Sequence, residues 1–403
     1  MHPATHVFQQ HPLQSSPDTQ VKMSYFEAPQ NVIVIGGGIV GSSIAWHLSK
    51  SPTTNTTIIA EQIGGVATPN SFAWVNAGST DKRFYYNFRH RSMAHWHEIE
   101  EAVPELSKYI HWGASLNWDI ANETERAEYG ERLMKWGYDV ITVNKTEIPT
   151  YESEFEESFL KTDWALRYTE EGQMEAHIVA EKLIDDAQTN GAGLLKTNVT
   201  SFLKKDGKIV GVVIDGGEEV YADHVVLAGG LGSVPLLAAV GVDLPLTPKA
   251  GLLINTVPTE RKLLNGVVYS HDLHLRQTAD GRIRTGSDFG GSDPTDNPQA
   301  VADDLFVKLQ AAFKGGDEIK YDYYTIGYRP TPEDGLPILG ETGVHGLTVA
   351  TMHSGVSNGA LVGKLISEMV LTGEKDPALA DFALSRFSNG TTSASKRRIR
   401  VDH

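Results

Sequence analysis

The stretch "NVIVIGGGIVGSSIAWHLSK", residues 31–50, joins an apolar run to a glycine cluster and then to a helical pattern. Residues 32–35 are continuously apolar, as expected of a strand that is buried on both faces of a parallel sheet. Apolar residues then recur at helical spacing over residues 44–48. The glycines between these two segments have the spacing G-x-G-x-x-G: Gly36, Gly38 and Gly41.

This strand–glycine–helix order predicts a dinucleotide site, although a glycine-rich turn without a nucleotide would share it. The glycines permit a tight turn, a close approach of backbone to a pyrophosphate, and close helix–strand packing. Ile39 and Val40 lie in the loop, where the N–H groups of the helix start face the phosphates. A second strand, "TTIIAEQ", ends in Glu61 and Gln62. Glu61 lies 20 residues beyond the last glycine, a position suited to the ribose hydroxyls, and it would repel the 2′-phosphate of NADP.

The segment "GGVATPNSFAWVNAG", residues 64–78, favours FAD over NAD. An NAD domain would continue into a helix and a third strand, whereas this segment is rich in small and hydroxyl residues. Thr68, Asn70 and Ser71 suit a pyrophosphate, and residues 74–76 can lie along a flat ring.

Two later segments complete the predicted nucleotide domain. "GKIVGVVIDGGEEVYADHVVLAGG" predicts a hairpin with a Gly-Gly turn, followed by a buried strand over residues 225–228. "GLTVATMHSGVSNGALVGKLISEMV" predicts a strand over residues 347–350 and a helix capped by Ser357 or Asn358.

Five motifs occur in the order of the D-amino-acid oxidase superfamily, which includes glycine oxidase and sarcosine oxidase. They are "IGGGIVGSSIAWHL", "GGVATPNSFAW", "VVLAGG", "GYRPTPEDGLPILG" and "HSGVSNGA". The chain resembles this superfamily over residues 30–388. The resemblance implies an α/β fold, with a Rossmann-type FAD-binding domain interleaved with a smaller α+β substrate domain built on an antiparallel sheet.

The expected domains are discontinuous. Residues 30–110, 165–235 and 335–387 would bind FAD, and residues 111–164 and 236–334 would bind the substrate. Residues 1–29 and 388–403 are polar, and we expect a disordered extension and a disordered tail there. The N-terminal residues 1–29 do not resemble a secretory signal.

The resemblance implies specific FAD contacts. The glycine loop and Glu61 would hold the ADP half, and Thr68, Asn70 and Ser71 would contact pyrophosphate and flavin. Val199 would lie beside the adenine, although a core strand residue would look the same. The strand end would contribute Ala228 and Gly229. The start of the last helix would lie at the pyrimidine edge of the flavin, where its positive end stabilises the reduced ring: His353, Ser354, Gly355, Val356 and Ser357. The alternative interpretation of His353 is a histidine that packs at the end of a strand without contacting the flavin.

Arg329 lies in "GYRPTPEDGLPILG", where nearby prolines make the backbone stiff and extended. The resemblance implies that its planar guanidinium binds the substrate carboxylate in a bidentate pair. A structural salt bridge to Glu333 or Asp334 is the alternative.

Three further side chains are weaker candidates for the substrate side. Tyr323 would share the face of Arg329 on one strand, and Lys249 is a candidate for the charge that governs reaction with oxygen. "GVVYSHDLHLRQTADGRIRTGSD" predicts a hairpin that turns at Asp280-Gly281. His274 and Arg276 share one face of this hairpin. That face could line the substrate side, but we favour an exposed outer surface of the sheet.

The expected reaction is oxidation of a C–N bond in an amino acid or secondary amine that bears a carboxylate. Hydride passes to the flavin, and the imine hydrolyses. The alternative is a flavin-dependent dehydrogenase of a 2-hydroxy acid or similar alcohol with an acceptor other than oxygen. No side-chain base is required if the amine binds in its neutral form. The chain has no cysteine, and no histidine lies between residues 64 and 86, so we expect non-covalent FAD.

The formal charge of −16 argues against nucleic acid and anionic membranes as partners. The expected partners are therefore the small-molecule amine or amino acid and an electron acceptor, oxygen or another. No apolar run of membrane-spanning length is found, and the absence of a targeting signal favours the cytoplasm. No metal site is predicted, because His95 and His97 lie at i, i+2 and cannot share a helix face.

Overall fold

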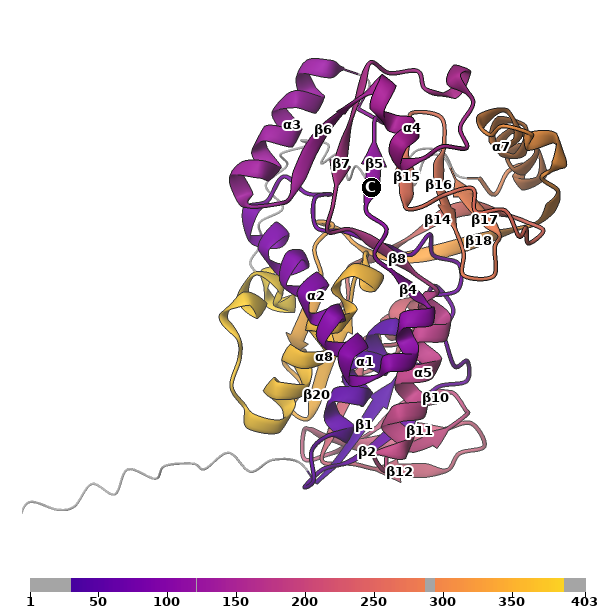
Figure 1. Cartoon of the computed structure of the whole chain (residues 1–403). Coiled ribbons are helices and arrows are strands. Elements are labelled where there is room, and N and C mark those ends of the chain that lie inside the picture. The colour runs from indigo at the N-terminus through magenta and orange to yellow at the C-terminus, as the bar shows by residue number, and fades with distance from the viewer. Residues whose placement is uncertain (1–29, 121, 287–293, 388–403) are drawn as a thin grey trace, which may run out of the picture.

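The computed structural model of the protein describes residues 30–120, 122–286 and 294–387. Two layered halves lie one above the other, with the chain passing between them several times (Figure 1). The sequence-based expectations for residues 1–29 and 388–403 concern segments outside the described residues. The predicted α/β fold class is confirmed.

The lower half in Figure 1 is built on a six-stranded sheet with the order β19-β20-β13-β1-β2-β9. All neighbours pair in parallel except β19, which pairs antiparallel with β20. The first strand of the chain is therefore central, between segments that lie far apart in sequence. The strand bounds are β1 Asn31–Ile35, β2 Asn55–Ile59, β9 Gly193–Leu195, β13 His224–Leu227, β19 Ile338–Glu341 and β20 Leu347–Thr351.

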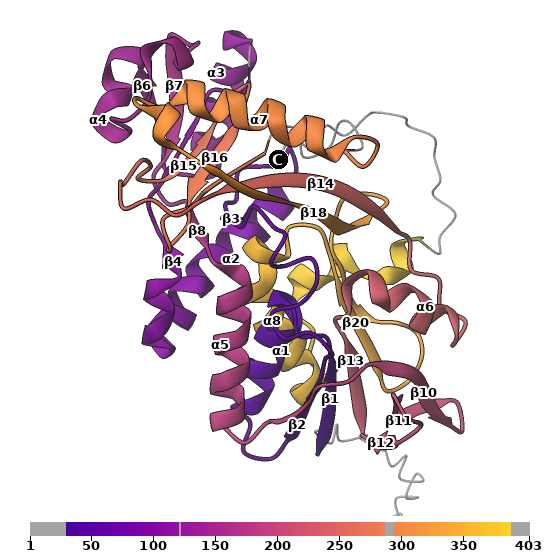
Figure 2. The same ribbon diagram turned by 90° about the vertical axis from the view of Figure 1, so that its right-hand side faces the viewer.

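Both faces of this sheet are buried, which explains the continuous apolar run in β1. Val32 and Val34 belong to the core beneath the helices, whereas Ile33 and Ile35 belong to the core on the opposite face. Figure 2 shows α1, α5 and α8 on one face and the small antiparallel sheet β10-β11-β12 on the other. The bounds are α1 Ile39–Ser49, α5 Ala176–Thr189, α8 Gly355–Thr372, β10 Val199–Lys205, β11 Lys208–Ile214 and β12 Glu219–Tyr221.

The upper half is built on an eight-stranded mixed sheet with the order β18-β14-β17-β16-β15-β5-β7-β6. Its outer face packs under α7, where Leu252 and Ile254 meet Leu305 and Leu309. The long antiparallel pair β14–β18 crosses the molecule beneath α7 (Figure 2). The bounds are β5 Ser115–Asn117, β6 Val140–Asn144, β7 Trp164–Tyr168, β14 Leu246–Thr256, β15 Val267–Tyr269, β16 His274–Gln277, β17 Ile283–Gly286, β18 Tyr321–Pro332 and α7 Pro298–Ala312.

A third, three-stranded sheet with the order β3-β8-β4 joins the two halves. β3 lies in the 64–78 segment, β4 follows the long helix α2, and β8 directly precedes α5. The remaining bounds are β3 Trp74–Val75, β4 Ile110–His111, β8 Gly172–Met174, α2 Arg83–Ala102, α3 Glu123–Trp136, α4 Ile148–Tyr151 and α6 Ser233–Ala238.

Most predicted elements are present, with two local differences. The Gly-Gly turn joins β11 to β12, and the turn at Asp280-Gly281 joins β16 to β17. The last helix begins three to four residues earlier than predicted, because its N-cap is Ser354, which adopts the left-handed region (φ 58°), and helix geometry starts at Gly355. In addition, β7 belongs to the larger sheet, so that sheet extends beyond residue 164.

The preference for an exposed outer surface at His274 and Arg276 is wrong. Arg276 has no exposed surface, and His274 stacks on Tyr269 with 3.4 Å between ring centres. Arg276 is buried because Glu175 at the start of α5 accepts its hydrogen bonds at 2.7 and 3.4 Å. Burial alone would raise the pKa of Glu175, but adjacent Arg276 outweighs this and lowers it. A paired buried ion of this kind could not be recognised from the hairpin alone.

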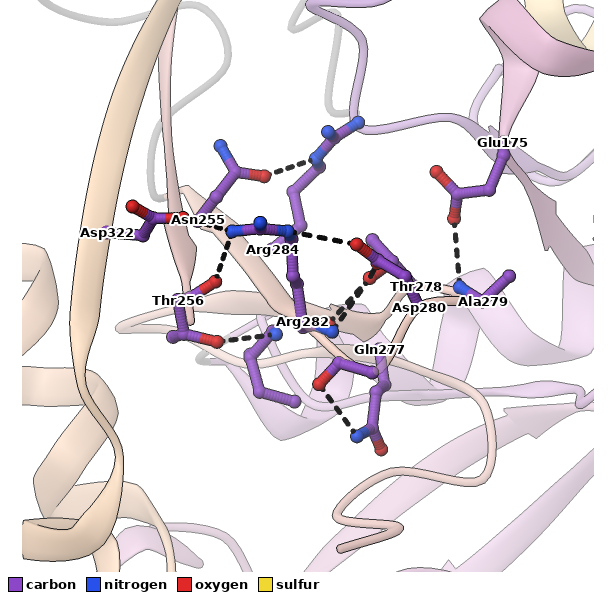
Figure 3. Close-up of polar contacts among 12 residues, drawn as sticks. Glu175, Asn255, Thr256, Gln277, Thr278, Ala279, Asp280, Arg282, Arg284 and Asp322 are labelled. Atoms are coloured by element: carbon purple, nitrogen blue, oxygen red, sulfur yellow. Dashed lines mark hydrogen bonds and ion pairs between the residues drawn. The ribbon is translucent and has the colours of Figure 1, made fainter. Parts of the chain in front are cut away.

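A second buried arginine, Arg284, lies directly across from Arg276 on the neighbouring strand. It reaches Asn255 at 2.8 Å, whereas Arg282 contacts Asp280, Thr256 and Asp322 (Figure 3). Burial first, and Arg276 second, lower the pKa of Arg284 to about 10. Its guanidinium also contacts the Ser71 carbonyl at 3.2 Å, so it ties the 64–78 segment to the upper sheet.

Among the residues that the structure describes, no helix combines the length and the apolar content needed to cross a bilayer.

Candidate active site

One cavity of about 640 Å³ lies at the carboxyl ends of β1, β13 and β20, between the two large sheets. The glycine loop forms one wall, and β14 and β18 form the opposite wall. The carboxyl edge of a parallel sheet is where such folds bind ligands. The sequence-predicted residues that line the cavity are Gly36, Gly38, Ile39, Val40, Glu61, Gln62, Thr68, Asn70, Ser71, Val199, Ala228, Gly229, Arg329, His353, Ser354, Gly355, Val356 and Ser357.

Gly41 does not line the cavity but closes the glycine loop from behind. A Cβ atom there would lie 2.0 Å from the Gly36 carbonyl oxygen, and one on Gly36 would lie 2.4 Å from the Ala228 carbonyl oxygen. Gly36 also has φ 118°, a conformation that favours glycine. Backbone therefore approaches backbone at two points, and the loop has room for a ligand only because side chains are absent.

The 64–78 segment packs directly on the glycine loop. Thr68 Oγ1 accepts a hydrogen bond from the backbone N–H of Ile39, the first residue of α1, at 3.2 Å. A Cβ atom on Gly65 would lie 2.6 Å from the Gly38 Cα atom. Thr68 thus lies at the helix start, as expected for a pyrophosphate contact.

Residues 74–77 form a rigid part of the cavity wall. Ser357 Oγ donates to the Trp74 carbonyl at 3.1 Å and accepts from the Asn76 N–H at 3.2 Å. Arg89, on α2, donates to the Asn76 carbonyl at 3.1 Å and to its side-chain oxygen at 2.5 Å. The N–H of Ala77 donates to the Tyr138 hydroxyl at 3.1 Å.

Glu171 holds this wall from the side opposite the cavity. It is 1% exposed and accepts hydrogen bonds from Trp74 Nε1 at 2.8 Å, the Tyr138 hydroxyl at 2.7 Å and Ser115 Oγ at 2.5 Å. Burial raises the pKa of Glu171 to about 7, against the opposing effect of these donors.

Replacing Glu171 by Gln should change how stability depends on pH. The folded pKa of about 7 exceeds the ordinary 4.5, so between these values the folded protein holds a proton that the unfolded chain has released. The wild type therefore loses unfolding free energy as pH rises through this window, by about 1.4 kcal/mol per pH unit. Urea unfolding of wild type and Glu171→Gln from pH 4.5 to 8 measures this effect. The difference between their unfolding free energies should change by about 3 kcal/mol across this range and become constant above pH 7. A constant difference across the range would contradict the raised pKa.

The substrate side of the cavity is formed by Arg329 and apolar side chains. Arg329 Nη2 donates to the Ala250 carbonyl at 2.9 Å, and Nε lies 3.4 Å from the Lys249 carbonyl, so strand β14 holds the guanidinium. A Cβ atom on Gly251 would lie 3.3 Å from Nη2. The neighbouring wall consists of Phe72, Trp74, Leu253, Tyr269, Ile326 and Tyr328.

A structural salt bridge of Arg329 to Glu333 or Asp334 is the alternative to carboxylate binding. Asp334 instead pairs with Arg386, with both carboxylate oxygens at 2.7 and 2.9 Å. This pair fixes the turn after β18 to the end of the described chain.

Tyr323 and Lys249 lie outside the cavity wall. Tyr323 shares a strand face with Arg329 but is six residues away, roughly 20 Å along an extended chain, and it is 40% exposed and packs on Arg282. Lys249 pairs directly with Arg329 across the strands, yet its side chain is exposed. Strand alternation predicted the shared face correctly but carries no information on how far the cavity extends along the strand.

Arg89 and Glu171 were missed by sequence analysis. Arg89 lies in an amphipathic helix pattern where an arginine is ordinarily exposed, and Glu171 stands in the turn "YTEEGQ". Neither has a local signal, since their roles depend on contacts with residues 74–77.

Comparison with known proteins agrees with this geometry. The family model described as FAD dependent oxidoreductase (DAO) matches residues 31–369. The bifunctional protein ThiO/ThiG of Trichormus variabilis is 26% identical over 89% of this chain, which spans only 55% of that relative. Glycine oxidase of Bacillus subtilis is 22% identical, with 85% of this chain and 93% of that protein covered. Among solved structures, L-proline dehydrogenase from P. horikoshii superposes with a TM-score of 0.78 at 21% identity, over 91% of this chain and 99% of that one, a likeness of fold.

The fold and the cavity define a flavin-dependent oxidoreductase. The cavity fits FAD: a glycine loop that no side chain can enter, an acidic residue at Glu61, and a long wall that leads away from the helix start of α1. The chain belongs to the DAO family of FAD-dependent oxidoreductases.

Proposed function

We propose that this enzyme oxidises the C–N bond of an amino acid or secondary amine that carries a carboxylate. The observation that supports this most is Arg329, which lines the same cavity as the glycine loop and is held in place by two carbonyls of β14. A planar guanidinium fixed at a cavity wall suits bidentate binding of a carboxylate.

The protein's part in this reaction is to bind, orient and exclude water. FAD, when bound, supplies a two-electron acceptor for the hydride. Arg329 would fix the carboxylate, and the apolar wall of Leu253, Tyr269 and Ile326 would keep water from the carbon that loses hydride. The amine lone pair forms the C=N bond as the hydride leaves, and water then cleaves the imine to a carbonyl compound and an amine or ammonia.

The described residues that line the substrate end of the cavity include no carboxylate that could act as a base. Among the described residues that line the cavity, Glu61 is the one acidic side chain, and it lies at the predicted ribose position. A substrate that binds as the neutral amine needs no base.

An anaerobic titration tests the proposal. The visible flavin band of purified protein is followed without oxygen while carboxylated amines are added, and air is then admitted. We expect bleaching by a carboxylated amine and not by the matching amine without a carboxylate. Rapid return of colour in air identifies an oxidase, and slow return identifies a dehydrogenase. Bleaching by a 2-hydroxy acid but by no amine would overturn the proposal in favour of the alcohol dehydrogenase.

We also propose that FAD is held without a covalent bond. The chain has no cysteine, which removes a thioether attachment. Acid precipitation should therefore leave the yellow colour in the supernatant and a colourless pellet. A yellow pellet would show a covalent link.

A further inference from the structure

Arg89 presents a buried positive charge to the flavin end of the cavity. It is 3% exposed, yet its side chain lines the cavity. Its Nε and Nη2 donate to Asn76, and its guanidinium lies 5.5 Å from the ring centre of Tyr85.

The charge of Arg89 is not neutralised by a carboxylate at ion-pair distance. In the described part of the chain, its hydrogen bonds go to Asn76 alone, a neutral residue. Its second terminal nitrogen, Nη1, has no protein acceptor there and is not enclosed by protein atoms. Glu171 acts on Arg89 at longer range: burial is the larger effect on the pKa of that carboxyl and raises it to about 7, whereas Arg89 lowers it. The charge of Arg89 is therefore only partly compensated by the protein, and burying such a charge is costly. An anion in the cavity would offset that cost.

The start of α8 adds to the same field. Ser357, in its first turn, accepts a hydrogen bond from the N–H of Asn76, the residue that Arg89 holds, and donates one to the Trp74 carbonyl. The N-terminus of a helix carries a partial positive charge. Two independent positive groups therefore converge on one residue of the cavity wall.

The position along the cavity identifies the anion. The glycine loop takes the pyrophosphate, which is the middle of FAD, and Glu61 and Val199 lie on the adenosine side of it. The isoalloxazine ring must then extend the other way, towards Asn76, Ser357 and Arg329. Two-electron reduction places negative charge on the N1–C2=O edge of that ring.

We propose that Arg89 stabilises the anionic reduced flavin and so raises its reduction potential, acting together with the N-terminus of α8. Lys249, the charge that the sequence suggested for reaction with oxygen, is exposed and lies outside the cavity wall, whereas Arg89 is buried and lines the cavity. This inference rests on FAD binding and is independent of which substrate reduces the flavin.

Two variants distinguish the effect of the Arg89 charge from the effect of its hydrogen bonds. Arg89→Met removes both the charge and the hydrogen bonds, and Arg89→Lys keeps the charge. Sulfite, which adds to the oxidised ring and leaves negative charge on the same edge, is the substrate-free probe. We expect Arg89→Met to raise the sulfite dissociation constant about tenfold and to lower the potential by about 30 mV, the equivalent for a two-electron couple. Arg89→Lys keeps the charge and should stay closer to wild type in both measurements.

Arg91→Met is the matched control, because it removes one positive charge from the same helix. Arg91 is largely exposed and pairs with Asp376 at 3.1 Å, so both readouts should match wild type. If Arg89→Met fails to fold, Asn76→Asp, which places a negative charge against the guanidinium, should change both readouts in the same direction.

Three results would overturn the inference. Unchanged sulfite affinity and potential with a raised KM for the amine would show that Arg89 binds the substrate carboxylate. Equal impairment in Arg89→Lys and Arg89→Met would show that its hydrogen bonds to Asn76 matter and its charge does not. Unchanged readouts in Asn76→Asp would exclude a charge effect. Failure of every amine to reduce the flavin would overturn the proposed function but leave these measurements intact.

Discussion

Replacing Arg329 by Leu should lower kcat/KM for the carboxylated amine by roughly 30- to 4000-fold. Losing one partner of a desolvated charge pair costs about 2–5 kcal/mol, and each 1.4 kcal/mol is tenfold. Most of the loss should be in KM if the carboxylate is bound equally in ground and transition states. FAD content should be unchanged, since the guanidinium contacts β14 on the substrate side. Steady-state kinetics with the best substrate from the anaerobic titration, together with the flavin-to-protein absorbance ratio, measure this.

Two companion variants interpret the result. Arg329→Lys keeps the charge but not the planar fork, so it should recover only part of the activity. Lys320→Leu removes an exposed positive charge directly before β18, and it should change kcat/KM by less than about twofold. Full activity in Arg329→Leu would exclude Arg329 as the carboxylate anchor, and an equal loss in Lys320→Leu would indicate general charge steering.

Replacing Gly41 by Ala should weaken FAD binding by about 10- to 100-fold. The new methyl group would lie 2.0 Å from the Gly36 carbonyl oxygen, and the backbone of Gly36 is tied to β2 by its hydrogen bond to the Ile59 carbonyl. Overpacking of this kind costs about 1–3 kcal/mol. The glycine loop must shift, and its N–H groups then no longer converge on the pyrophosphate. The expected result is a nearly colourless purified protein whose melting temperature rises only at high added FAD.

Gly193→Ala is the matched control. It makes the same chemical change in the edge strand β9 of the same sheet, where a Cβ atom would lie 3.6 Å from its nearest neighbour. This variant should retain FAD. A Gly41→Ala protein that purifies with full flavin content would show that the loop tolerates the methyl group.

Sequence analysis found many residues on the glycine-loop side of the cavity because that side depends on local chemistry. The spacing of Gly36, Gly38 and Gly41 is a backbone requirement, and Glu61 follows at a distance fixed by one helix and one strand. The hairpin turns at Gly216 and Gly281 were found for the same reason, since each has positive φ.

The parts that the sequence did not predict depend on contacts between distant segments. Arg89 is buried only because Asn76, thirteen residues earlier, provides two acceptors. Arg276 is buried because Glu175, 101 residues earlier, neutralises it. No local periodicity or spacing in the sequence indicates such pairs. For this reason, sequence analysis favoured an exposed position for Arg276.

The order of the six-stranded sheet also bears on how the protein matures. β1 is made first, yet its neighbour β13 is completed at residue 227, and β20 and the start of α8 follow only after residue 346. A nascent chain therefore carries the glycine loop long before it has Ser357 to hold residues 74–77. Only a nearly complete chain can enclose the flavin, so retained FAD reports that synthesis reached the last helix. A finished chain without FAD would lack the stability that the bound ligand adds.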